Sequence, residues 1–110
     1  MKKLYIVKNN YQFEDIIKYG NCIKNKYYVI YSKDNNLAYD RFGISVSKKL
    51  GNAVVRNHYK RKIRSIIDNY RKLYINKKDY IIIVRKQAIN QPFDILETEF
   101  VTLINKRKEK

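Results

Sequence analysis

A strand, a glycine turn and a strongly basic helix follow one another over Phe42–Arg64, and this run constrains the fold more than any other part of the chain. Phe42, Ile44 and Val46 alternate with small residues, which is typical of a strand with one buried face. After the turn, apolar residues recur every three to four positions, which predicts a helix over residues 53–74. A chain built this way must pack a highly charged helix against a sheet, with the apolar side of the helix turned inward.

The cations of this run lie close together, and no acidic residue interrupts them. They are Lys48, Lys49, Arg56, Lys60, Arg61, Lys62 and Arg64. Arg56, Lys60 and Arg64 are spaced by four and therefore fall on one helix face, with Asn57 and Arg61 beside them. We call these five residues the basic stripe. Arg71 falls on the same arc, and the neighbouring arc is apolar. It carries Tyr59, Ile63, Ile66, Ile67, Tyr70 and Tyr74.

The basic stripe has two interpretations. A lysine-rich helix is usually a solvated face, and the abundance of lysine across the chain favours that view. Here arginine dominates and an asparagine is interleaved, a mixture suited to forked contacts with phosphates and base edges. The formal net charge of +15 on 110 residues also calls for a polyanionic partner. We therefore predict that the stripe binds nucleic acid.

Length and composition limit the other possibilities. The 110 residues suffice for one domain, and no apolar run approaches the ~20 residues that span a bilayer. The apolar stretch near the start ends at Lys8, which is too short for a secretory signal. Cys22 is the only cysteine, which excludes an intramolecular disulfide and a thiolate metal cluster. We expect a cytoplasmic protein without a membrane partner.

The remaining segments predict an α/β (α+β) two-layer sandwich over residues 1–110. The first helix is expected to run from Asn9 or Asn10 to Gly20, and a last helix should begin where Asp94 and Glu97 form a capping box. The expected strands are a short one at 21–24 and longer ones at 27–32, 39–47 and 80–84. The apolar run at 80–84 indicates a central strand covered on both faces. In the strand at 39–47, Gly43, Ser45 and Ser47 share one nearly bare face, which is either open to a ligand or merely solvated.

Residues suited to catalysis are sparse. His58 is the only histidine, and no partner or nucleophile stands near it in sequence, so we expect a surface residue. The acidic residues are scattered, whereas two-metal nuclease chemistry needs clustered carboxylates. We predict no catalytic residue, no metal site and no cofactor of the protein's own.

The segment Ser45–Arg64 strongly resembles the signature of the bacterial ribonuclease P protein subunit. The family's Arg-Asn pair, Lys-Arg pair, aliphatic residue and final Arg correspond to Arg56-Asn57, Lys60-Arg61, Ile63 and Arg64, and Ser47–Val54 matches the approach to them. This resemblance implies a mixed four-stranded sheet with about three helices and a split βαβ unit with a left-handed crossover. It further implies a monomer, one per RNA, that binds the catalytic RNA subunit and the single-stranded 5′ leader of precursor tRNA.

In such a holoenzyme the RNA subunit cleaves the leader with bound magnesium, and the protein assists. The resemblance assigns RNA binding to Lys48, Lys49, Arg56, Asn57, Lys60, Arg61 and Arg64. It assigns the leader cleft to Phe13, Ile17, Tyr31, Ser45 and Ser47. Ile17 and Ile6 stand where many relatives carry an aromatic residue and an arginine. The rival interpretations are a ribosomal-type or RNA-chaperone protein and a protein-only nuclease.

Overall fold

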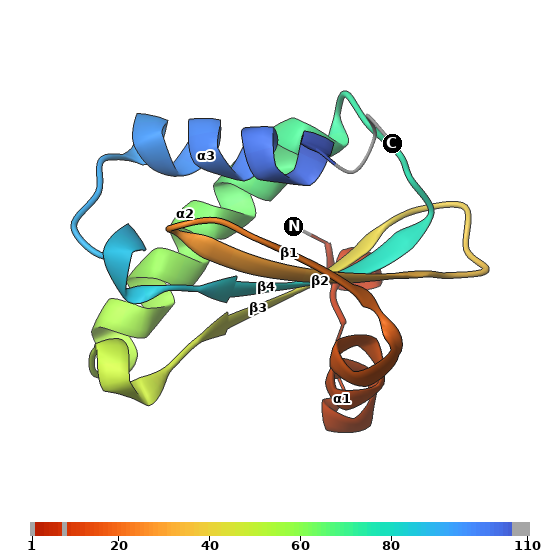
Figure 1. Cartoon of the computed structure of the whole chain (residues 1–110), viewed down its shortest axis with the longest axis horizontal. Coiled ribbons are helices and arrows are strands. Elements are labelled where there is room, and N and C mark those ends of the chain that lie inside the picture. Colours follow the sequence, from red (N-terminus) through yellow and green to blue (C-terminus); the bar gives the residue numbers. More distant parts are fainter. Residues whose placement is uncertain (1, 8, 107–110) are drawn as a thin grey trace.

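The computed structural model describes residues 2–7 and 9–106, and its elements follow the predicted order (Figure 1). They are α1 (Asn10–Tyr19), β1 (Asn21–Lys24), β2 (Tyr28–Asp34), β3 (Arg41–Val46), α2 (Ala53–Arg71), β4 (Lys78–Val84) and α3 (Phe93–Asn105). The basic helix ends earlier than its periodicity indicates, because Tyr74 leaves the helix and stacks on Tyr70 at 4.9 Å between ring centroids. Single 3₁₀ turns at Lys3–Tyr5, Lys48–Leu50 and Lys86–Ala88 complete the described elements.

The four strands form one mixed sheet in the order β1-β2-β4-β3. β3 runs parallel to β4, and the other two pairings are antiparallel. β4 is central, and Tyr80, Ile81, Ile82 and Val84 are buried, which confirms the expectation of a strand covered on both faces. The βαβ unit is not split as expected, because β2 pairs with the far side of β4 and leaves β3 and β4 as direct neighbours.

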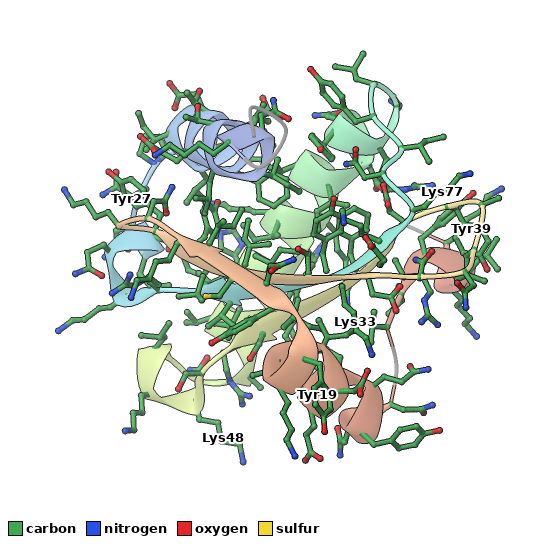
Figure 2. The ribbon with its side chains drawn as sticks, turned by 45° about the vertical axis from the view of Figure 1, so that its right-hand side comes forward. Tyr19, Tyr27, Lys33, Tyr39, Lys48 and Lys77 are labelled. Atoms are coloured by element: carbon green, nitrogen blue, oxygen red, sulfur yellow. The ribbon has the colours of Figure 1, made fainter. Side chains whose placement is uncertain are left out.

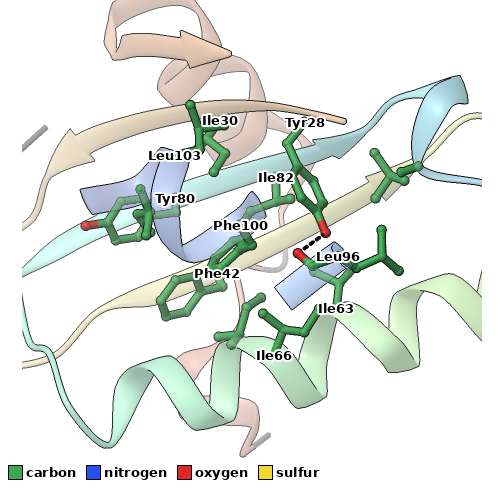
Figure 3. Close-up of a cluster of buried hydrophobic side chains, with 14 of the residues drawn as sticks. Tyr28, Ile30, Phe42, Ile63, Ile66, Tyr80, Ile82, Leu96, Phe100 and Leu103 are labelled. Carbon is green, nitrogen blue, oxygen red and sulfur yellow. Dashed lines mark hydrogen bonds between the residues drawn. The ribbon is translucent and has the colours of Figure 1, made fainter. Parts of the chain in front are cut away.

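Two helices cover one face of the sheet, and α1 covers the other (Figure 1). The larger core lies between the sheet and the pair α2 and α3, where Phe42 stacks on Tyr80 at 5.1 Å. The buried Tyr28 hydroxyl donates a hydrogen bond to the carbonyl of Leu96 at 2.9 Å, which ties β2 to α3 (Figure 3). Burial raises the pKa of Tyr28 far above its ordinary value, with a smaller contribution from Glu99.

The smaller core lies under α1. Val7, Ile16 and Ile81 are buried there, and Phe13, Tyr31 and Ile83 pack around them half-buried. This second cluster fixes α1 across the sheet and thereby decides which of its side chains face the strands.

The ends of α1 agree with the sequence-based expectation. The Asn9 N–H donates to Gln12 Oε1 at 3.5 Å, and the Gly20 N–H donates to the Ile16 carbonyl at 2.8 Å. A Cβ at Gly20 would lie 2.4 Å from that carbonyl oxygen, so only glycine fits there. The chain can therefore leave the helix and enter β1 at once.

The start of α3 differs from the prediction. The helix begins at Phe93 after Pro92, so Asp94 lies inside its first turn and does not cap it. Glu97 does not complete a capping box either, since its Oε2 accepts a hydrogen bond from Asn69 on α2 at 3.0 Å. Proline fixes an extended backbone before the helix and replaces the expected cap. α3 carries Asp94, Glu97 and Glu99 and no lysine or arginine.

A buried carboxylate organises the entry to β4. Asp40 is 3% exposed and accepts hydrogen bonds from the backbone N–H groups of Asn76 at 3.0 Å and Lys78 at 2.7 Å. Next to it, Arg41 holds Asp79 with two contacts, Nε to Oδ1 at 2.9 Å and Nη2 to Oδ2 at 2.6 Å. These contacts join the first residues of β3 and β4 and fix the register of the parallel pair.

Candidate nucleic-acid interface

The turn between β3 and α2 is built by local capping. The Ser47 hydroxyl accepts a hydrogen bond from the Lys49 N–H at 3.2 Å, and Asn52 Oδ1 accepts one from the Val55 N–H at 3.0 Å. Ser47 therefore lies beyond the end of β3 and caps the turn, so its prediction as a strand residue is wrong. Lys48 and Lys49 are exposed, and Lys48 projects away from the fold (Figure 2).

The structure brings the basic stripe together on one side of α2, as the spacing predicts. Asn57, Arg61 and Arg64 are exposed, and Arg56 and Lys60 are half-buried. The ion pairs formed within residues 2–7 and 9–106 do not involve any of its four cations or the two lysines of the turn. The buried Nε of Arg56 also has no hydrogen-bond partner in this part of the chain.

Arg71 does not extend the stripe. Its guanidinium lies 3.5 Å from the centroid of the Tyr5 ring, and its Nη1 is 3.5 Å from Asp68 Oδ1. These contacts hold the N-terminal turn against the end of α2. The cations of α2 without ion pairs among the described residues therefore lie in its first three turns.

On the opposite face of the sheet, Phe13 packs directly on Gly43. A Cβ at Gly43 would lie 2.5 Å from Phe13 Cζ and 2.9 Å from Ile81 Cδ1. The face that the sequence shows as bare is therefore covered at Gly43 by an aromatic ring, so at this residue it is neither open nor merely solvated. Ser45, one step further along β3, is half-buried.

The other residues assigned to the leader cleft lie on the same side of the sheet as α1. Ile17 is 39% exposed on α1, and Tyr31 is half-buried on β2. Cys22 pairs with Tyr31 across β1 and β2. Charge repulsion from the Cys22 side chain is the main cause that raises the pKa of the Tyr31 hydroxyl, and burial and a hydrogen bond with Cys22 add to it. Phe13, Ile17, Tyr31 and Ser45 thus border one partly apolar surface.

A pocket of about 360 Å³ joins the two faces at the outer edge of β3. We call it the edge pocket. Asn10 and Phe13 reach it from α1, Gly43 from β3, and Lys60 and Arg64 from α2. The N-terminal segment runs beside it and pairs with β3, where the Val7 N–H donates to the Phe42 carbonyl at 3.0 Å. Lys60 and Arg64 of the basic stripe and Phe13 of the predicted leader cleft therefore line the same pocket.

Sequence reasoning did not identify Asn10 as part of this site. In sequence it indicates only a possible helix cap, because its position beside residues of α2 in the pocket depends on the fold and leaves no local pattern. Ile6 also borders the pocket, through the pairing of its segment with β3.

Groups suited to catalysis do not gather at this surface. His58 is exposed, and its ring packs edge-on against Tyr59 at 5.4 Å. Within the described residues, no three His, Cys, Asp or Glu side chains are placed to hold a metal ion. No described helix has the length and apolar character needed to cross a bilayer. What the surface offers is positive charge, half-buried rings and amide groups.

The sequence profile of the ribonuclease P family matches residues 1–108. The chain belongs to the ribonuclease P protein family. The ribonuclease P protein component of Mycoplasma mycoides subsp. mycoides is 43% identical over 109 residues, which cover 98% of this chain and 100% of that protein. The component from Streptococcus pneumoniae is 44% identical over 86 residues, covering 78% of this chain and 70% of that protein.

Solved ribonuclease P proteins share the fold. The Staphylococcus aureus protein superimposes with a TM-score of 0.87 at 37% identity, over 94% of this chain and 95% of that one. The Thermotoga maritima protein gives a TM-score of 0.82 at 27% identity, over 87% and 91% of the two chains. The chain is therefore a ribonuclease P protein component, the protein part of an endoribonuclease that acts in 5′ maturation of tRNA.

Proposed function

We propose that the chain binds the ribonuclease P RNA subunit through its basic stripe and turn lysines, and the single-stranded 5′ leader of precursor tRNA on the α1 side of the sheet. The RNA-binding set comprises Lys48, Lys49, Arg56, Asn57, Lys60, Arg61 and Arg64. The leader surface comprises Phe13, Ile17, Tyr31 and Ser45. The protein acts in the cytoplasm as a monomer, one per RNA, and the RNA subunit uses magnesium to cleave the leader.

The observation that carries the proposal is the set of cations around the β3–α2 turn without carboxylate partners among the described residues. Cations held this close together repel one another, and phosphates relieve that repulsion while releasing counterions. The protein would thus screen phosphate repulsion between the catalytic RNA and its substrate. Half-buried rings beside the cations add a stacking surface that tolerates any base sequence.

Salt dependence tests the role of the stripe. Replacing Arg56, Arg61 and Arg64 by Ala removes up to three phosphate contacts, so the slope of log affinity against log salt should flatten by about 2 to 3. A control that removes three exposed lysines elsewhere, at positions 72, 86 and 106, should leave the slope nearly unchanged. Equal slopes for the two triple variants, both folded, would contradict binding through the stripe.

The leader surface is tested with two ligands. Phe13→Ala should weaken holoenzyme binding to precursor tRNA by ~1–3 kcal/mol, the value of one base–aromatic stack, and should hardly affect mature tRNA. Equal losses for both ligands would make Phe13 a purely structural residue.

Protein freed of RNA by ribonuclease treatment should leave precursor tRNA uncut at any magnesium concentration, and specific 5′ cleavage by that sample would favour a protein-only nuclease.

A further inference from the structure

A mostly apolar groove of about 480 Å³ lies between α2 and α3, on the face of the sheet opposite α1 (Figure 1). We call it the α2–α3 groove. Ile66, Tyr70 and Leu73 line it from α2 and the turn after it, and Glu97 and Val101 line it from α3. Leu73 is 77% exposed. A single exposed leucine is common, but one that borders an apolar groove enlarges a continuous apolar patch, and such patches mark interaction sites.

The dimensions of the groove suit a helix as its ligand. Ile66, Tyr70 and Leu73 are spaced by four and three positions, so they extend the apolar lining over about 10 Å, or two helical turns. When an amphipathic helix docks in a groove, its own apolar side chains recur at the same spacings. Two turns of such a helix can therefore lay their aliphatic side chains along this lining.

The charge of the groove is opposite in sign to the net charge of the chain. Glu97 is the one charged residue in the described lining, and its carboxylate accepts a hydrogen bond from the neutral amide of Asn69 without an ion pair among the described residues. Asp94 precedes it on α3, which carries no lysine or arginine. A partner with a lysine or arginine gains an ion pair at Glu97, whereas the phosphates of a nucleic acid meet a carboxylate and no cation in this lining.

We propose that the α2–α3 groove docks a basic amphipathic helix of a partner protein, with aliphatic side chains over Tyr70 and Leu73 and a lysine or arginine beside Glu97. A second copy of this chain fits less well, because each copy carries a net charge of +15 and the two repel. The groove begins at Ile66, after the basic stripe ends at Arg64, and lies on the face of the sheet away from α1. The ribonucleoprotein could thus recruit a protein while it holds RNA.

The probe is a fluorescein-labelled helical peptide of about 14 residues, or four turns, with leucine on one face and lysine on the other. Fluorescence anisotropy follows its titration with the full chain free of RNA, where both molecules are cationic and do not attract each other by net charge. Leu73→Ser should weaken binding about 10-fold, as expected when one leucine side chain is no longer buried. The matched control is Val54→Ser, an aliphatic residue of α2 that is 78% exposed outside the groove, and it should change the affinity less than about 2-fold.

A second pair of variants tests the charge. Glu97→Gln keeps a hydrogen-bond acceptor for Asn69 and removes the carboxylate, so peptide binding should weaken about 3-fold, the effect of an exposed ion pair. Glu99→Gln removes the same charge from α3 outside the groove lining, and screening should keep its effect under about 1.5-fold at physiological salt. Equal effects of the two substitutions would show that the peptide senses only the net charge, and would overturn the proposal.

The other occupants give different results. A dimer in light scattering that Leu73→Ser dissociates would assign the groove to a second copy, and weaker association of Leu73→Ser with the RNA subunit would assign it to RNA. Either outcome refutes the proposal, as does a peptide that binds Leu73→Ser and the wild type equally. Holoenzyme with Leu73→Ser should cleave precursor tRNA at the wild-type rate, and a loss of cleavage would place the groove among the RNA contacts instead. Thermal melts check that each variant is folded.

Discussion

Because Phe13 packs on Gly43, we predict that Gly43→Ala changes the free energy of unfolding in opposite directions in the wild-type protein and in the Phe13→Ala variant. In the wild-type protein, Gly43→Ala would place a methyl group 2.5 Å from Phe13 Cζ and 2.9 Å from Ile81 Cδ1. Overpacking of this kind costs about 1–3 kcal/mol of unfolding free energy. Phe13→Ala alone should cost about 2 kcal/mol, roughly half the value for a fully buried ring, because the side chain is half-buried.

With both substitutions, the space that the ring leaves would hold the methyl group and would also let Ile81 Cδ1, the end of a side chain, move away from it. Gly43 lies in regular strand backbone without a positive φ, so alanine there should stabilise by about 0.4–1 kcal/mol through the unfolded chain. Gly43→Ala should thus destabilise the wild type and stabilise Phe13→Ala, a coupling of at least about 1.5 kcal/mol. Urea unfolding followed by far-ultraviolet circular dichroism measures all four proteins. Effects that add within about 0.5 kcal/mol would show that Phe13 does not rest on Gly43 in solution.

Three further outcomes follow from features of the fold. Burial is the chief cause that raises the pKa values of Tyr28 and Tyr70. Above the ordinary tyrosine pKa of 10.0 the unfolded chain ionises before the folded one, so the free energy of unfolding should fall as the pH rises above that value and stay unaffected below it. Alkaline unfolding curves should show a shallower decline for Tyr28→Phe. Asp40→Ala should cost about 2–4 kcal/mol, since the N–H groups of Asn76 and Lys78 lose their acceptor, and Asp40→Asn should cost less in the same denaturant assay. Raising sodium chloride from about 0.05 to 0.5 M should increase the thermal midpoint, because screening weakens the self-repulsion of a chain of net charge +15, and a lower midpoint would contradict this.

Periodicity predicted the helices and strands because each buries one regular face. The central position of β4 was visible in its unbroken apolar run, and the face of α2 that binds the core was visible in its spacing. The boundaries that failed depend on single contacts. Tyr74 leaves α2 for a ring contact with Tyr70, and Pro92 starts α3 without the predicted acidic cap.

The candidate site was only partly predictable. The basic stripe is a property of one helix and can be read from its sequence. Phe13 packs on Gly43, and Asn10 lines the same pocket as Arg64. The residues of each pair lie more than 25 positions apart in sequence, and their proximity depends on how a helix crosses the sheet. A bare strand face in the sequence shows that space exists, but does not show which side chain fills it.

The acidic helix α3 makes the charge of the molecule uneven. Its three carboxylates stand on the side of the sheet away from α1, and a group of cations without ion pairs among the described residues stands at the β3–α2 turn. An uneven charge distribution orients a protein in the field of a polyanion before contact, so collisions with the β3–α2 turn forward are favoured and the association rate rises. The carboxylates of α3, which touch no nucleic acid in this arrangement, would then contribute to how quickly the complex forms and little to its lifetime.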